Sequence, residues 1–199
     1  MRAFRELERV EDRVLGALRL VDAGTGAPIL RRLQIEAVSA PAPRLVRNPS
    51  GLVVVASWPP LAAHREHFDA PPAEPAPGSL SLDLAITDPE GQYMPRRCRM
   101  ALPRNPDPDA PDSLLRALDV PMYPAPAAAL GTNWSALRVS LASAAGEALG
   151  GALLRVRRSG EVLARGLTDW RGGGLVAVVG VPVTTFSEGE DVVVVSEIE

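Results

Sequence analysis

Proline is the residue type that most restricts how this chain can fold. Twenty of the 199 residues are proline, and each one fixes φ and removes a backbone hydrogen-bond donor. Because the prolines are spread along the chain, they argue against a bundle of long helices. Aromatic residues make up only 4% of the chain, so the core has to be built mainly from Val, Leu, Ile and Ala.

Between the prolines lie short segments in which apolar and polar residues alternate. Residues 80–86 alternate strictly, and residues 52–56 form another clear strand pattern. Alternation of this kind indicates a strand with one buried and one solvated face. Turn chemistry separates the segments, as in Asp-Ala-Gly-Thr-Gly at 22–26 and Asp-Pro-Glu-Gly at 88–91. Short strands with turn signals about every ten residues predict an all-β chain of antiparallel sandwiches.

The distribution of these patterns predicts two small antiparallel β-sandwich modules of the transthyretin or immunoglobulin type, arranged in tandem. We expect the first module at 13–104, a Pro/Asp-rich linker at 105–133 and the second module at 134–199. The linker holds six prolines, four aspartates and one arginine, and a proline-rich segment of this length is semi-rigid. Within it, residues 113–118 fit about a turn and a half of helix. Residues 1–12 are either a short amphipathic helix or an arm.

The second module resembles the carboxypeptidase regulatory-like domain, a transthyretin-like sandwich. The resemblance lies in a glycine-rich turn, a following strand and a Thr-Asp-x-x-Gly turn, which are residues 146–152, 154–156 and 168–172. A looser version occurs at 21–29 and 87–91, so the resemblance covers about 14–103 and 134–195 and implies a duplicated module. Domains of this family are generally accessory: they pack, space or bind, while chemistry takes place elsewhere.

Charge and composition exclude several classes of partner. The formal net charge is −3 and the 21 basic residues are dispersed, whereas phosphate binding requires a dense basic face. The only cysteine, Cys98, excludes an internal disulfide and a Cys-rich zinc site. The charged start lacks the apolar run of a signal peptide, and no stretch suffices to span a bilayer. We expect a cytoplasmic protein without nucleic-acid or membrane partners, retained in the cell or released within a particle.

The two histidines are the first candidates for chemistry. His64 and His67 are three residues apart, and on a helix Glu66 or Asp69 would add oxygen ligands for a transition metal. The alternative, a polar surface loop beside a proline run, is favoured. The spacing of three also differs from that of metalloproteases, whose two zinc-binding histidines are four residues apart.

No other motif indicates a catalytic, cofactor or metal site. Residues 105–109 alternate oxygen side chains as a calcium loop does, but Ala110 and Arg116 stand where an EF-hand needs Gly and Glu, which favours a solvated acidic linker. A phosphate-binding glycine loop and a Gly-x-Ser-x-Gly elbow are both absent from the sequence. We therefore expect no catalytic residues, no cofactor and no metal.

The remaining candidates are interface residues. Trp170 lies in a turn beside Arg171, where it is either an exposed interface anchor or a cap on the end of the sandwich core. The run Val192, Val193, Val194 and Val195 indicates an edge strand paired with a partner, since such a run left exposed would aggregate.

These features favour a non-catalytic structural protein that acts in a homo- or hetero-oligomeric assembly. Accessory sandwiches of this composition resemble components of phage-tail-like contractile injection particles. The alternative is an accessory module of an enzyme system that binds carbohydrate or metal, and it predicts exposed aromatic residues along one sheet face.

Overall fold

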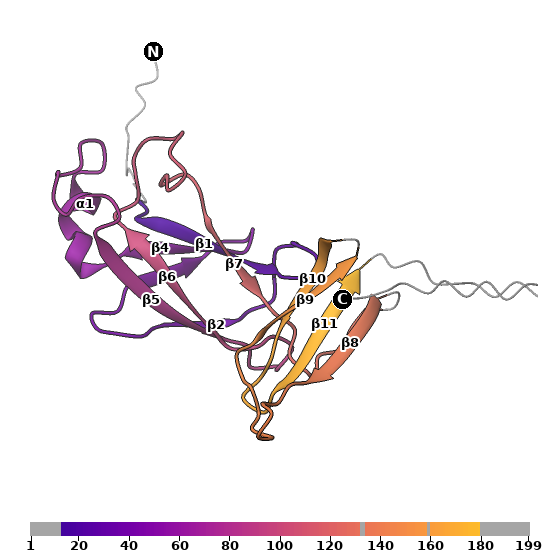
Figure 1. Cartoon of the computed structure of the whole chain (residues 1–199). Helices are drawn as coiled ribbons and strands as arrows, with labels where there is room; N and C mark the ends of the chain where they lie inside the picture. The colour runs from indigo at the N-terminus through magenta and orange to yellow at the C-terminus, as the bar shows by residue number, and fades with distance from the viewer. Residues whose placement is uncertain (1–12, 132–133, 159, 180–199) are drawn as a thin grey trace, which may run out of the picture. The chain divides into compact units, whose positions relative to one another are not determined.

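The computed structural model describes residues 13–131, 134–158 and 160–179. Within these ranges the chain forms eleven β-strands, one short 3-10 helix at Pro59–Leu61 and one α-helix, α1 at Ala62–Glu66. The prediction of a predominantly β chain built on several antiparallel pairings is confirmed (Figure 1). In the described part of the chain, no helix has the length and apolar character needed to cross a membrane.

The described strands form four sheets. One has four strands in the order β3-β4-β1-β7, one has three in the order β2-β5-β6, and two are pairs, β10-β9 and β11-β8. The strands are β1 (Gly16–Asp22), β2 (Gln34–Ala37), β3 (Arg44–Arg47), β4 (Leu52–Ser57), β5 (Leu80–Thr87), β6 (Arg96–Leu102), β7 (Leu118–Met122), β8 (Trp134–Ser140), β9 (Leu153–Arg158), β10 (Glu161–Leu167) and β11 (Gly173–Val179).

Alternation of residues sets the buried face of the larger sheets. In β1 every second residue is buried, and β4 pairs with it antiparallel with Leu18 opposite Val53. In β5 the alternate residues Leu82, Leu84 and Ile86 are buried. Each strand therefore presents one apolar face to the interior, as the period-two pattern predicts.

The three-stranded and four-stranded sheets approach each other closely at Gly16. A Cβ built at Gly16 would lie 3.1 Å from the sulfur of Met100 and 3.4 Å from a methyl of Leu102, both on β6. Met100 and Leu102 are themselves buried. Glycine at this position leaves room for the Met100 and Leu102 side chains of β6 to pack against the backbone of β1.

The last two strand pairs enclose a small core of their own. β8 pairs antiparallel with β11, and β9 pairs antiparallel with β10 (Figure 1). Buried residues of three strands form the cluster, and half-buried leucines pack against it: Val156, Ala164, Val176 and Val178, with Leu137 and Leu154. The cluster holds no aromatic side chain, in agreement with the prediction of an aliphatic core.

The described residues group into two compact units, and the chain passes between them more than once. One unit contains 13–19, 36–84 and 99–118, and the other contains 20–35, 85–98 and the described residues from 119 onward. The passages between the units lie within strands β1, β2, β5 and β6 and at the start of β7. The boundaries of two tandem modules, at 104 and 134, stay a prediction.

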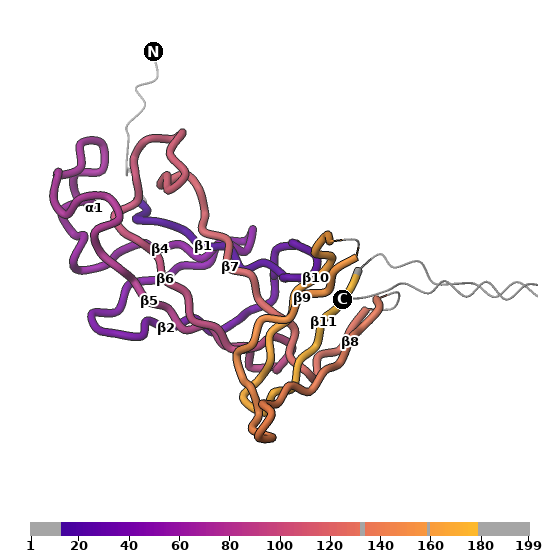
Figure 2. Tube along the Cα trace, in the orientation of Figure 1, coloured from indigo at the N-terminus to yellow at the C-terminus, as the bar shows by residue number. Residues whose placement is uncertain are grey.

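The stretch 105–133 contains structure that the sequence did not predict. It includes β7, which carries Pro121, and proline is tolerated there because β7 lies at the edge of its sheet. The helix expected at 113–118 is not formed. The segment makes turns instead, and the Leu114 N–H donates to the distant Asn105 carbonyl at 2.7 Å rather than to a carbonyl of the preceding turn. Figure 2 traces this loop from the end of β6 to the start of β7.

The predicted turn chemistry after β1 is confirmed in detail. The Asp22 carboxylate accepts hydrogen bonds from the N–H groups of Gly24 and Thr25 at 3.0 and 2.8 Å. Its other oxygen accepts the hydroxyl of Tyr93 at 2.9 Å. Burial of that hydroxyl and the adjacent Asp22 charge raise the pKa of Tyr93, so the phenol stays protonated as a donor.

Candidate protein-interaction site

Trp170 projects into solvent from the turn between β10 and β11. Its exposed fraction is 81%, the largest among the exposed large apolar side chains of the described residues. Trp170 is therefore exposed, as an interface anchor requires, and does not cap the core; its role at an interface stays a prediction. The other two tryptophans differ: Trp58 is buried and donates its indole N–H to the Pro41 carbonyl, and Trp134 is half-buried.

A carboxylate holds the turn that carries Trp170. One oxygen of Asp169 accepts the N–H groups of Arg171 and Gly173, each at 2.9 Å. The Arg171 guanidinium donates to the other oxygen at 3.2 Å. Backbone bonds complete the turn, since the Asp169 N–H donates to the Gly173 carbonyl and the Gly172 N–H donates to the Asp169 carbonyl. Every residue from 169 to 173 except the tryptophan takes part in these bonds.

Two residues tie the turn to the neighbouring loop. The Thr168 hydroxyl donates to the Leu149 carbonyl at 2.7 Å and accepts the Ala152 N–H at 2.9 Å. Gly172 has a φ of +76°, and a Cβ there would overlap the carbonyl oxygen of Leu141. The Trp170 turn, which we define as Thr168–Gly173, is thus fixed at both ends.

The Thr-Asp-x-x-Gly sequence of the first half forms a turn with a similar set of carboxylate hydrogen bonds. The Asp88 carboxylate accepts N–H groups two and four residues later, from Glu90 and Gln92, at 3.0 and 2.9 Å. An arginine pairs with it as well, here Arg31 at 2.7 Å. The two turns differ in what they present, since Pro89 stands where the second turn has Trp170. Of these two turns, only the second carries an aromatic residue at this position.

Further residues beside Trp170 fit an interface. The Arg171 guanidinium lies 5.4 Å from the centre of the Trp170 ring, within the range of a cation–π contact, and both side chains are exposed. Leu149, whose carbonyl accepts the Thr168 hydroxyl, is itself exposed. The turn therefore presents an aromatic residue and an arginine together, and both are residue types enriched at interaction hot spots.

Acid is expected to loosen the Trp170 turn. Burial of the Asp169 carboxyl opposes ionisation, but hydrogen bonds from Gly173 and Arg171 outweigh it and lower the pKa of Asp169 below its ordinary value. The stabilisation from this carboxylate is therefore complete above the unfolded pKa of about 3.9 and is lost as pH falls through the lower folded value. An NMR titration of the Gly173 amide should show the turn opening only below about pH 4.

The Asp169→Asn variant should be less stable than the wild type at pH 7 and should not show this acid transition. Asp109→Asn, at an exposed position of another loop, serves as the control and should keep the transition. An unchanged acid transition in Asp169→Asn would show that Asp169 is not the group responsible.

Other predicted residues lie outside the described ranges. Val192, Val193, Val194 and Val195, the candidate partner-paired strand, lie outside the described residues, and so does the predicted arm or helix at 1–12. Their proposed roles stay predictions.

The two histidines do not share an environment. His64 lies in α1 and its side chain is buried. His67 follows the helix and is exposed, and its Nδ1 lies 3.1 Å from the Ala63 carbonyl oxygen. Among the described residues, no group of three or more His, Cys, Asp and Glu side chains is placed to hold a metal ion.

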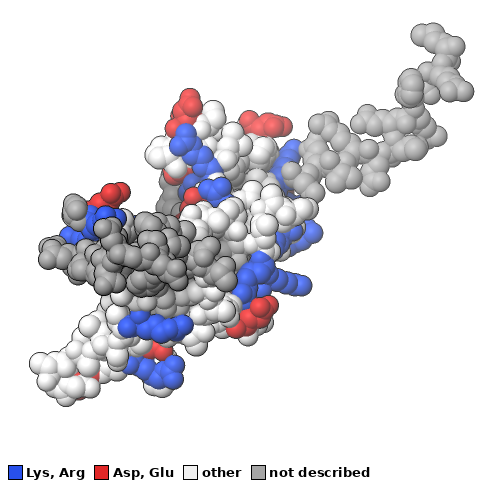
Figure 3. Space-filling model, turned by 90° about the vertical axis from the view of Figure 1, so that its right-hand side faces the viewer, with Lys and Arg blue, Asp and Glu red and all other residues white. Residues whose placement is uncertain are grey.

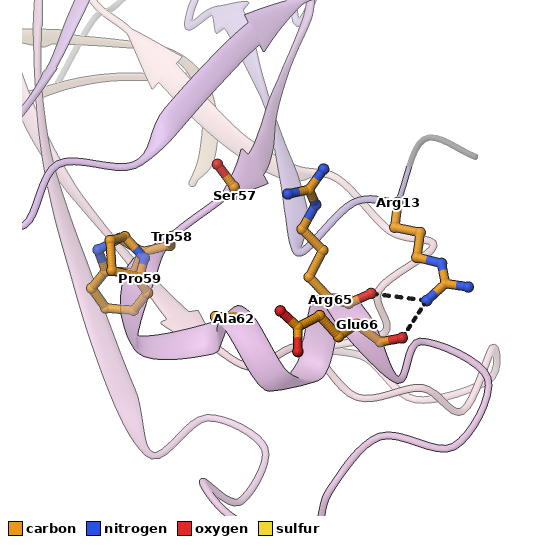
Figure 4. A pocket seen from close by; sticks show the side chains of 7 residues that line it. All are labelled: Arg13, Ser57, Trp58, Pro59, Ala62, Arg65 and Glu66. Carbon is orange, nitrogen blue, oxygen red and sulfur yellow. Dashed lines mark hydrogen bonds between the residues drawn. The ribbon is translucent and has the colours of Figure 1, made fainter. Parts of the chain in front are cut away.

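A pocket of about 430 Å³ lies beside α1 and the end of β4. Trp58 and Pro59 stand at one side and Arg13 at the other (Figure 4). The Arg13 guanidinium donates to the carbonyls of Arg65 and Glu66 at 3.0 and 2.7 Å, where it closes the end of the helix. This arginine therefore has a structural role that limits its use toward a ligand.

Charged residues are mixed rather than segregated on the surface. On the side drawn in Figure 3, arginines alternate with aspartates and glutamates among uncharged residues, and the described residues form no face of a single sign there. The described residues visible on that side therefore do not form the dense basic surface that nucleic acid requires.

Comparison with known proteins adds no relative. The chain matches no protein-family model, and it has no significant match among curated proteins or solved structures. The resemblance to carboxypeptidase regulatory-like domains therefore rests on the turn and strand motifs alone.

Proposed function

We propose that this chain is a non-catalytic interaction protein that acts within a larger protein assembly. The observation that carries the proposal is Trp170, which is 81% exposed on a turn fixed by the Asp169 and Thr168 hydrogen bonds. Exposing the apolar surface of a tryptophan to water is unfavourable, so its burial by a partner would contribute to binding. A rigid turn lowers the conformational entropy lost on binding. A fixed, accessible aromatic residue flanked by arginine is therefore suited to anchor a protein partner.

The use of polar side chains supports a non-catalytic role. The carboxylates of Asp22, Asp88 and Asp169 each accept two or more hydrogen bonds from N–H groups of their own turns. The sequence contains no nucleophile-and-base motif, and the two histidines differ in burial. These groups stabilise loops, which is what an interaction scaffold requires.

We propose further that the chain consists of two tandem sandwich modules of the carboxypeptidase regulatory-like type. The matching Asp88 and Asp169 turns support a duplication, because each binds the N–H groups two and four residues later. The assembly that we propose is a contractile injection particle of the phage-tail type, in which the chain contacts other proteins and neither nucleic acid nor a membrane.

Removing the Trp170 side chain should separate the chain from its assembly without unfolding it. Truncation of a hot-spot tryptophan typically weakens binding by about 2 kcal/mol or more, or about thirtyfold. Gradient sedimentation of a native extract should show Trp170→Ala shifted from large complexes toward free chain. The thermal midpoint should stay close to that of the wild type, because the side chain is exposed.

Leu115→Ala is the matched control for this experiment. Leu115 is also a highly exposed apolar residue, at 74%, but no fixed aromatic turn surrounds it. We expect Leu115→Ala to sediment with the wild type. Equal behaviour of wild type and Trp170→Ala would remove the turn from the proposed interface.

A further inference from the structure

The loops that follow α1 and β6 enclose a second pocket, of about 230 Å³, that is almost wholly apolar. Ten of its twelve lining residues are apolar, and the other two are His64 and Arg104. Five of the ten are the prolines Pro71, Pro72, Pro77, Pro103 and Pro106. Proline has a fixed φ and no N–H, so this wall is stiff and offers no backbone donor at those positions.

One of the two polar residues is buried without a partner. His64 is only 8% exposed, and its Nδ1 has no hydrogen-bond partner among the described residues. A buried polar atom left unsatisfied costs about 1–3 kcal/mol. Such a group is retained where something else forms the missing bond, and His64 lines the pocket in which a ligand would do so.

Arg104 supplies the charge. Its Nη2 makes two long hydrogen bonds, to the carbonyls of Ser113 at 3.3 Å and Arg116 at 3.4 Å. Within the described residues its Nε and Nη1 make no hydrogen bond, so the guanidinium keeps donors for an anion. The guanidinium and the imidazole are both able to donate, and they are the only polar side chains of an otherwise apolar lining.

We propose that this pocket binds a small monocarboxylic acid with a compact apolar body. An apolar cavity of about 150 Å³ suffices for benzene, so about 230 Å³ accommodates a body of that size together with a carboxylate. The apolar body lies against the proline wall, and the carboxylate accepts hydrogen bonds from Arg104 and His64. The site is independent of the Trp170 turn and requires neither a metal nor a partner chain.

NMR titration of the full chain with benzoate and hexanoate tests the proposal. We expect saturable shifts at pocket residues with a Kd of about 1 mM or tighter. Benzamide, a neutral molecule of nearly the same shape, should bind about tenfold more weakly, because it lacks the charge that Arg104 pairs with. Absence of saturable shifts with both acids would overturn the proposal, and equal binding of benzamide would overturn the carboxylate as the recognised group.

Two variant pairs locate the site. His64→Leu should weaken benzoate binding about tenfold while leaving the thermal midpoint unchanged or raised, because it removes an unsatisfied buried group. The exposed neighbour His67→Leu should leave binding unchanged. Ala73→Phe should close the pocket and abolish binding, whereas Ala76→Phe, in the same exposed loop but outside the lining, should not. Benzoate binding that survives Ala73→Phe would place the ligand elsewhere and refute the assignment.

Discussion

Replacing Gly172 with alanine is expected to lower the free energy of unfolding by at least about 3 kcal/mol, although the change adds only one methyl group. Gly172 has a φ of +76°, and the new Cβ would overlap the Leu141 carbonyl oxygen. The Leu141 N–H also donates to the Gly172 carbonyl at 2.8 Å, so neither backbone can move without breaking that bond. Urea denaturation followed by tryptophan fluorescence measures the loss.

Gly146→Ala provides the matched comparison. Gly146 has a similar φ of +83°, but nothing lies within 4 Å of the position a Cβ would take. This variant carries only the left-handed strain, about 1 kcal/mol. If both variants lost the same stability, the close contact with Leu141 would not constrain the Trp170 turn.

The Thr168→Val variant is expected to lose about 2–4 kcal/mol although valine has nearly the same shape. Thr168 is 1% exposed, and its hydroxyl bonds to both the Leu149 carbonyl and the Ala152 N–H. Valine would leave these two part-buried backbone groups without this partner. The thermal midpoint of the full chain checks the loss.

The first Thr-Asp-x-x-Gly turn offers the control at the equivalent position. Thr87 is exposed, and its hydroxyl bonds only to the Gln34 side chain at 3.3 Å. Thr87→Val should therefore change stability by less than about 0.5 kcal/mol. A loss in Thr168→Val as small as in Thr87→Val would show that the hydroxyl does not hold the Trp170 turn in place.

Strands in the interior of the sheets were predictable because burial of one face enforces alternation. The pattern at 80–86 became β5 and the run at 52–56 became β4, each with one further residue. Strands β3 and β7, in contrast, both lie at the edges of their sheet. β3 has only four residues and β7 contains Pro121. Neither strand therefore has a sequence pattern that predicts it.

The same distinction applies to the candidate sites: features set by neighbouring residues could be predicted from the sequence, and features set by distant segments could not. The Asp169 turn and the exposure of Trp170 follow from local chemistry, since a carboxylate binds N–H groups within its own turn. The locking of that turn by Leu141 and Leu149 depends on segments far along the chain. For His64 the local sequence indicated the wrong environment. Its neighbours Arg65, Glu66 and His67 are polar, and they favoured a surface loop. His64 is buried all the same, and it lines one pocket together with residues of the distant loop at 103–114, a proximity that local sequence cannot predict.

The proposal that this chain works in an assembly is tested most directly by the solution mass of the full chain. Light scattering would be measured on the purified protein, and the migration of the chain would be followed in native extract. The proposal predicts a defined mass above the 21.1 kDa of a single chain, or migration of the chain with a much larger particle. A monomer of 21.1 kDa in both settings would contradict it.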